Sequence, residues 1–252
     1  MSFITLMYHE IREGQMLKAD RPSPIHVRQD YHDELPSPLF VTLEGFEEQL
    51  KFLYEHGYHS LSLEEVRQYY YEGKELPDKS VLFTFDDCYQ SVKRYAYPLL
   101  KKHHFQAVAF VVTGWLHTSP KPFTPDQSVC LTAPELEEMK DVFEYANHTD
   151  LFHTRTGASS SAIMEADNLT FSEDLDRCNA KGIISATDTF AYPFGLYTDR
   201  NLSLLRDKGF RLAFTSEGGR NDRSLDPLLL RRNVVPYFMK LEQFIGLLEN
   251  RA

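Results

Sequence analysis

The strongest constraint on the fold is a short run, residues 81–85, that leads directly into two aspartates, Asp86 and Asp87. The run is mostly apolar and rich in β-branched and aromatic residues, which predicts a buried strand with both carboxylates at its C-terminal end. Catalytic groups collect at that end in folds built from parallel strands. Adjacent carboxylates repel, so we expect a bound cation or a raised pKa on one of them. A solvated turn, with one aspartate capping the next helix, is the alternative that this run leaves open.

Predicted strands and helices alternate along the whole chain. Strands are predicted at 3–8, 59–61, 81–86, 107–112, 142–146, 189–192, 210–215 and 228–235, and helices at 44–56, 62–71, 89–103, 132–140, 171–181, 199–208 and 241–249. This alternation predicts an α/β fold with a parallel sheet in a single domain, residues 1–252, and the number of strands favours an irregular barrel. Residues 11–40 form a long polar segment with four prolines, Pro22, Pro24, Pro36 and Pro38, which is typical of a functional lid or a partly disordered loop.

Composition narrows the possible partners. The net charge is −10, which argues against nucleic acid or an anionic membrane as partner and suits a weakly charged small molecule or a sugar. Three widely spaced cysteines form neither a zinc signature nor a disulfide framework, so reduced thiols are expected. The sequence shows no signal peptide and no apolar run of about 18 residues. A cytoplasmic location is therefore expected for the chain as written, and a cell-surface location if the native form is longer.

Several polar residues fall at predicted strand ends and could act together. They include His9, the Asp86–Asp87 pair, and His148 with His153. One aspartate and two histidines are a ligand set for Zn²⁺ or a related divalent ion with open positions. Two histidines five residues apart share neither a helix face nor a strand face, so they converge only if the segment bends. Two unrelated polar loop histidines are the open alternative.

Three motifs in this order resemble the polysaccharide deacetylases with a NodB homology domain, which form carbohydrate esterase family four. The motifs are Thr84-Phe-Asp-Asp87, His148-Thr149-x-x-x-His153 and Ala191-Tyr-Pro-Phe-Gly195. The resemblance covers almost the whole chain. It implies a distorted (β/α) barrel of about seven strands, NodB-like, that hydrolyses acetyl groups on sugars with one divalent metal ion.

The resemblance also implies roles for individual residues. Asp87, His148 and His153 would be the metal ligands, Asp86 the catalytic base, and the backbone N–H of Phe194 the donor to the oxyanion. The motif positions further suggest substrate binding by four residues, namely Tyr8, Tyr192, Pro193 and Gly195. Zinc is the expected metal, with nickel, cobalt and iron as alternatives.

One branch of the family explains two departures from its usual pattern. The two histidines lie five rather than four residues apart, and no histidine follows His153. Both features resemble the poly-β-1,6-N-acetylglucosamine deacetylases of the PgaB and IcaB type, in which a Tyr-His near the start of the domain supplies the general acid. Leu6-Met-Tyr-His9 matches that motif and makes His9 the predicted acid. Two other differences are Cys88 in place of the usual glycine, and Ala191-Tyr192 in place of an arginine that pairs with the base.

The predicted function is the metal-dependent removal of N-acetyl groups from a poly- or oligosaccharide that contains N-acetylglucosamine. A carbohydrate is therefore the expected partner, and the oligomeric state is left open. A metal-dependent hydrolase of another small or cyclic amide is one alternative. A carbohydrate-binding protein without catalysis is the other.

Overall fold

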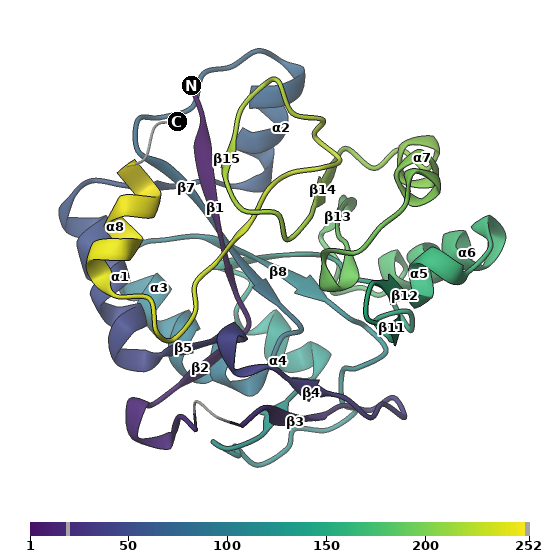
Figure 1. The fold of residues 1–252 in the computed structure, drawn as a ribbon, viewed down its shortest axis with the longest axis horizontal. Coiled ribbons are helices and arrows are strands. Elements are labelled where there is room, and N and C mark those ends of the chain that lie inside the picture. The colour runs from purple at the N-terminus through teal and green to yellow at the C-terminus, as the bar shows by residue number, and fades with distance from the viewer. Residues whose placement is uncertain (19–20, 250–252) are drawn as a thin grey trace.

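Strand β7, Ser80–Asp86, lies in the middle of the main sheet of the computed structural model, which describes residues 1–18 and 21–249 (Figure 1). The sheet follows the order β14-β13-β10-β8-β7-β1-β15, with β16 and β6 paired to β1 and β7. All strands from β14 to β1 run parallel, and only β15 pairs antiparallel. The strands are β1 (Phe3–Tyr8), β6 (His59–Ser60), β8 (Ala107–Val111), β10 (Phe143–Asn147), β13 (Ala186–Ala191), β14 (Leu212–Phe214), β15 (Arg220–Asn221) and β16 (Asn233–Val234).

The helices lie around this sheet, with α1, α3 and α8 gathered on one side of it and α5, α6 and α7 on the other in Figure 1. Their bounds are α1 (Leu43–Glu55), α2 (Leu63–Tyr71), α3 (Tyr97–Lys102), α4 (Ala133–Glu137), α5 (Ala162–Glu165), α6 (Asn168–Asn179), α7 (Asp199–Asp207) and α8 (Leu241–Glu249). None of the helices within the described residues is long and apolar enough to cross a membrane.

The two-residue period of β7 assigns its side chains to the two faces of the sheet. Phe83 and Phe85 pack in the cluster that contains Phe46 of α1, whereas Leu82 belongs to the cluster on the opposite face. Asp86 follows Leu82 and Thr84 in register, so its carboxylate leaves the strand on the same face as Leu82. The packing of the phenylalanines against the helices therefore fixes the direction in which Asp86 points.

The prediction of a distorted barrel is confirmed, and the sheet curls into a half-barrel whose pairing path ends at β14 and β15. The assignment of residues 1–252 to one domain stays a prediction. The expected strand at 228–235 is reduced to β16 and one bridge between Phe214 and Leu230. The expected helix at 89–103 starts as a π-helical turn, Val92–Ala96, in which the N–H of Tyr97 reaches the carbonyl of Val92. Pro98 has no N–H to continue the regular pattern, which accounts for the irregular start.

The described part of the long polar segment, residues 11–18 and 21–40, lies at the carboxyl ends of the parallel strands. Two small sheets hold them: β2 (Glu10–Arg12) pairs with β5 (Phe40–Thr42), and β3 (Ser23–His26) lies between β4 (Glu34–Leu35) and β9 (Ser128–Val129). The buried guanidinium of Arg12 donates to the Ser23 hydroxyl at 2.8 Å and lies 5.0 Å from the centre of the Phe40 ring. The expectation of a functional lid or a partly disordered loop stays a prediction, and the described part of the segment is pinned across that end of the sheet.

The capping box of α2 provides a test of the local structure. Ser62 Oγ accepts from the N–H of Glu65 at 3.2 Å, and the Glu65 carboxylate accepts from the N–H of Ser62 at 2.8 Å. We predict that Ser62→Ala lowers the free energy of unfolding by about 1 kcal/mol in urea titrations, because one end of the box is lost. Ser62→Asn keeps an acceptor at the cap and should lose only a small part of this. Equal losses in both variants would contradict a capping role.

Candidate active site

Three parallel strands deliver polar residues to one end of the sheet. His9 follows β1, Asp86 ends β7 with Asp87 directly after it, and His148 follows β10. β1 and β7 are neighbours, and β8 lies between β7 and β10, so the carboxyl ends of these parallel strands meet at one edge of the sheet. The chain turns sharply after β7, where Asp87 and Cys88 have φ angles of 69° and 57°. Glycine adopts such left-handed φ angles most readily, so Cys88 has a conformation that favours glycine. The Cys88 side chain is buried in the core beneath the turn.

The structure brings Asp87, His148 and His153 together. One side-chain ligand atom from each lies within 4.8 Å of the others, and all three residues are buried. Asp87 Oδ1 lies 3.6 Å from His153 Nε2 and 3.9 Å from His148 Nε2. Thr149, with φ at 80°, starts the bend that returns His153 to the cluster. The five-residue spacing is thus compatible with one shared centre.

The donor set fits a divalent metal ion. Asp87 Oδ1 is buried without a hydrogen-bond partner, which is costly unless a cation lies beside it. Burial and the neighbouring charge of Asp86 raise the pKa of Asp87 to about 8. Burial lowers the pKa of His148 and of His153, so both imidazoles are neutral and can donate a lone pair. His148 Nδ1 donates to the Ala191 carbonyl at 2.8 Å, which leaves Nε2 free for a ligand bond.

Asp86 is held in a different way, by a buried arginine. Arg232 donates to Asp86 Oδ1 at 2.6 Å and to the carbonyl of Thr215 at 2.8 Å. Burial alone would raise the pKa of Asp86, but the charge of Arg232 and its hydrogen bond to the carboxylate hold that pKa well below its usual range. Oδ1 is thereby occupied, whereas Oδ2 faces His9 and His148 at 3.6 and 3.9 Å. Asp86 is therefore an ionised carboxylate with one oxygen directed into the site.

His9 lies beside this oxygen. Its Nε2 is 3.6 Å from Asp86 Oδ2, and its Nδ1 is buried without a hydrogen-bond partner. Burial lowers the pKa of His9 to about 4, so the imidazole is neutral at rest. The structure thus brings the histidine that follows the first strand within reach of the aspartate that ends β7.

These groups line a cavity of about 320 Å³. Part of its wall comes from residues 25–39, including Ile25, Tyr31 and Leu35, and Trp115 and Phe194 form another part. Trp115 packs with its ring centre 4.6 Å from that of His153, and Phe194 lies 4.5 Å from it on another side. The cavity therefore joins the polar cluster to apolar walls, which is the usual make-up of a small-molecule site.

The predicted substrate-binding residues divide into two groups. The side chains of Tyr8 and Tyr192 point away from the cavity: the Tyr8 hydroxyl donates to Gln49 at 3.0 Å, and the Tyr192 hydroxyl donates to the Leu228 carbonyl at 3.1 Å. Pro193 is buried beside them. Gly195 and Phe194 do line the cavity, and both have left-handed φ angles, 69° and 60°. Any part of Tyr8 or Tyr192 in substrate binding is thus confined to the backbone.

Sequence reasoning missed Arg232, which is the hydrogen-bond partner of Asp86. It comes from the loop before β16, 146 positions after Asp86. The available signal was the Arg231-Arg232 pair inside a predicted strand whose other residues, apart from Asn233, are apolar, because a buried arginine requires an anionic partner. Tyr31, Trp115 and Arg155 also line the cavity and were not predicted as site residues.

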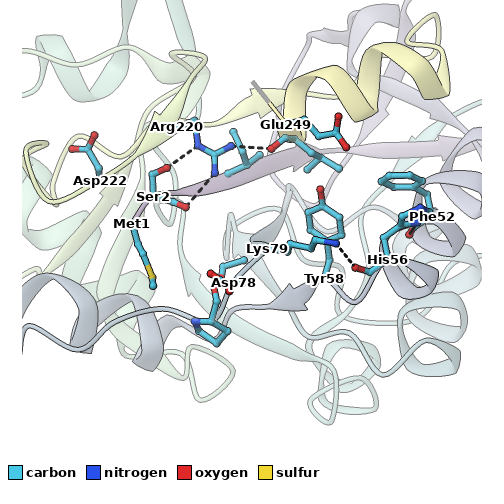
Figure 2. A pocket seen from close by; sticks show the side chains of 14 residues that line it. Met1, Ser2, Phe52, His56, Tyr58, Asp78, Lys79, Arg220, Asp222 and Glu249 are labelled. Atoms are coloured by element: carbon cyan, nitrogen blue, oxygen red, sulfur yellow. Dashed lines mark hydrogen bonds between the residues drawn. The ribbon is translucent and has the colours of Figure 1, made fainter. Parts of the chain in front are cut away.

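A second cavity of about 660 Å³ lies at the opposite end of the sheet, beside the start of β1 and β7 (Figure 2). Its basic side chains bind other parts of the chain. Lys79 donates to the His56 carbonyl at 2.9 Å, and Arg220 donates to the Ser2 hydroxyl at 2.8 Å (Figure 2). The smaller cavity is the candidate active site, because it contains the convergent carboxylates and histidines.

The fold and the site are those of an α/β barrel protein with an Asp-His-His centre. Residues 73–213 match the polysaccharide deacetylase family, and the chain belongs to that family. A curated relative, the poly-β-1,6-N-acetyl-D-glucosamine N-deacetylase of Staphylococcus aureus, is 31% identical over 182 residues, which is 70% of this chain. The chain spans 61% of the length of that relative.

Solved structures share the fold across nearly the whole chain. IcaB from Ammonifex degensii superposes with a TM-score of 0.74 at 24% identity, over 98% of this chain and 97% of IcaB. The deacetylase PplD of Streptococcus pyogenes, solved with acetate, gives a TM-score of 0.74 at 24% identity over 99% of both chains.

The Asp86–Arg232 pair leads to a prediction about stability. Arg232→Met should lower the free energy of unfolding by about 3–5 kcal/mol, because it leaves a buried carboxylate without its partner. The control Arg231→Met, at the neighbouring and partly exposed position, should cost about 1 kcal/mol or less. Urea unfolding of Arg232→Met combined with Asp86→Asn checks the cause, since removing the unpaired charge should restore part of the loss. A double variant as unstable as the sum of both single variants would contradict the pairing.

Proposed function

We propose that this chain removes N-acetyl groups from a polysaccharide that contains N-acetylglucosamine, with poly-β-1,6-N-acetylglucosamine as the first candidate substrate. The observation that carries the proposal is the arrangement of Asp86: Arg232 occupies one of its oxygens, and the other faces both His9 and the Asp87-His148-His153 cluster. Family membership and the S. aureus relative support the reaction and the sugar.

We propose Asp87, His148 and His153 as the ligands of one divalent ion. Two neutral imidazoles and a carboxylate favour zinc, with nickel, cobalt and iron as alternatives. When bound, the ion would polarise the acetyl carbonyl and lower the pKa of water.

In this mechanism one proton passes through two side chains in turn. Asp86 Oδ2 accepts the proton of the water that attacks the acetyl carbon, and Arg232 keeps the carboxylate ionised and oriented for this step. The backbone N–H of Phe194 donates to the carbonyl oxygen as negative charge builds up on it. The left-handed backbone at Phe194 and Gly195 places this turn at the cavity wall.

His9 then protonates the departing nitrogen, because an amine leaves poorly as an anion. His9 is neutral at rest, so it must first gain a proton. Asp86 Oδ2, which lies 3.6 Å from His9 Nε2, holds the proton taken from water and is the nearby source. One proton thus passes from water to Asp86, to His9 and to the sugar nitrogen, and both side chains return to their initial states.

The size and walls of the cavity support a sugar as ligand. Its volume is about 320 Å³, which suits about one sugar ring with its acetyl group. The aromatic and aliphatic walls, among them Trp115 and Leu35, can pack against the apolar faces of a sugar and exclude water. Residues 25–39 would therefore act as a wall of the substrate site.

The test of this proposal is acetate release from matched oligomers of N-acetylglucosamine, with β-1,6 and β-1,4 linkages, together with elemental analysis of the purified protein. We expect one metal ion per chain and faster acetate release from the β-1,6 oligomer. Turnover of small amides in place of both oligomers would overturn the polysaccharide assignment. Sugar binding without a metal ion or acetate release would indicate a binding protein instead.

Metal binding and proton transfer can be separated by mutation. Asp86→Asn should keep its metal ion but lower the rate of acetate release about 10²–10⁴-fold, because it cannot accept the proton. Asp87→Ala and His148→Ala should lose both the metal ion and activity, because each removes a ligand. Metal content and initial rates check the split. Equal metal loss in all three variants would show that Asp86 is itself a ligand.

Removal of the metal ion gives an independent prediction. Dialysis against a chelator should abolish acetate release, and adding back Zn²⁺ should restore it, since no other group in the cavity can polarise the carbonyl as strongly. The same cycle with Co²⁺ and Ni²⁺ identifies the metals that the site accepts. Full activity after complete metal removal would contradict the proposed mechanism.

A further inference from the structure

The segment that joins the two metal-binding histidines is held by a buried carboxylate from helix α6. Asp174 is fully buried, and its two oxygens accept from the backbone N–H groups of Asp150 and Leu151, each at 2.8 Å. Both donors lie between His148 and His153. A carboxylate that accepts two backbone N–H groups acts as a rigid clamp, because charged acceptors form the stronger hydrogen bonds.

Other groups fix the same bend from its remaining sides. The Asn147 side chain accepts from the N–H of Thr149 at 2.8 Å, which stabilises the left-handed residue at the start of the bend. On the opposite side, Gly114 donates its N–H to the Asp150 carbonyl at 2.9 Å. A Cβ on Gly114 would lie 2.3 Å from that carbonyl oxygen, so the bend and the Gly114 backbone are in direct contact.

The two histidines depend on this bend to different degrees. His148 leaves β10 directly, and its ring is fixed through Nδ1 by the Ala191 carbonyl. The Nδ1 atom of His153 has no hydrogen-bond partner, so the ring is oriented by its packing and by the path of the backbone before it. The position of His153 therefore depends on the bend, and the bend depends on Asp174.

We propose that Asp174 is a positioning residue for the metal site. It acts indirectly, by holding the backbone between His148 and His153. This inference rests on the metal site of the proposed function. Asp174 touches neither the cavity nor the three ligand side chains. Through the two N–H groups it sets where His153 Nε2 lies relative to Asp87, and so it sets how tightly a divalent ion is bound.

The test is the affinity for Zn²⁺, measured by competition with a chromophoric chelator in the whole chain without substrate. Asp174→Asn keeps the size of the side chain but replaces one acceptor oxygen with an NH₂ group. This group is itself a donor, so it cannot accept from the backbone N–H that it faces. We expect Zn²⁺ affinity to fall about 10- to 100-fold, as is usual when a group that supports a ligand is lost. The control Asp176→Asn changes an exposed residue of the same helix, which pairs with Lys208, and should leave the affinity unchanged.

The absorption spectrum of the Co²⁺-loaded protein provides a readout that a purely structural role would not move. Loss of His153 from the Co²⁺ ion should weaken and shift the visible bands in Asp174→Asn and not in Asp176→Asn. Unchanged affinity and an unchanged spectrum in a folded Asp174→Asn protein would overturn the proposal. If the parent protein itself binds no divalent ion, the proposed metal site fails instead, so the two failures are distinguishable.

A second pair of variants covers the case in which Asp174→Asn does not fold. Leu151 is exposed and donates its N–H to Asp174 from the surface bend. Leu151→Pro removes this donor without changing α6, whereas Leu151→Ala retains it. We expect weaker Zn²⁺ binding in Leu151→Pro and near-parent binding in Leu151→Ala. Equal affinities in the two variants would overturn the clamp.

Discussion

The buried ion pair between Asp86 and Arg232 allows two adjacent aspartates to end a buried strand. Two carboxylates this close repel, and both are buried at the wall of the cavity. Arg232 neutralises one of them through a 2.6 Å hydrogen bond, and the other, Asp87, retains an oxygen without a hydrogen-bond partner beside two neutral imidazoles. The two carboxyl groups, alike in sequence, thus differ in the structure: Asp86 is a fixed ionised carboxylate, and Asp87 has an oxygen available beside the imidazoles. Removing the arginine would abolish this difference, because both carboxylates would then depend on the charge of a single bound cation.

The separation of the two aspartates also depends on backbone geometry. Asp86 is still part of β7, so the alternation that buries Phe85 against α1 directs its carboxylate to the other face of the sheet. Asp87 lies in a left-handed turn, which sends its side chain toward the histidines after β10. A side chain at Cys88 is tolerated in the same conformation at a modest cost, since a non-glycine residue there is disfavoured by about 1–2 kcal/mol. The packed strand therefore orients the Asp86 carboxylate, and the turn orients the Asp87 carboxylate.

Features carried by local patterns could be predicted from the sequence, whereas features that depend on distant contacts could not. The strand before Asp86, the capping box at Thr132 and the histidine after β1 follow from short-range signals, and the structure contains all three. Arg232 reaches Asp86 from 146 positions away, and no local pattern names its partner. Tyr8 shows a different limit. It was assigned to the substrate site with His9, but neighbours in an extended strand point to opposite faces, and Tyr8 stacks on Phe85 in the core.

His148 and His153 lie five positions apart, a spacing that matches neither a helical turn nor a strand repeat. The backbone polar groups of the bend between them therefore cannot bond to one another in a regular pattern. Here they bond outward instead: to Asn147 and Asp174 through N–H groups, and to Thr113 and Gly114 through carbonyls. Helix α6 thereby holds the bend that carries His153, although it supplies no residue of the Asp87-His148-His153 cluster. The position of His153 is then coupled to the packing of α6 on the sheet, and substitutions beneath that helix are expected to act on metal binding as well as on stability.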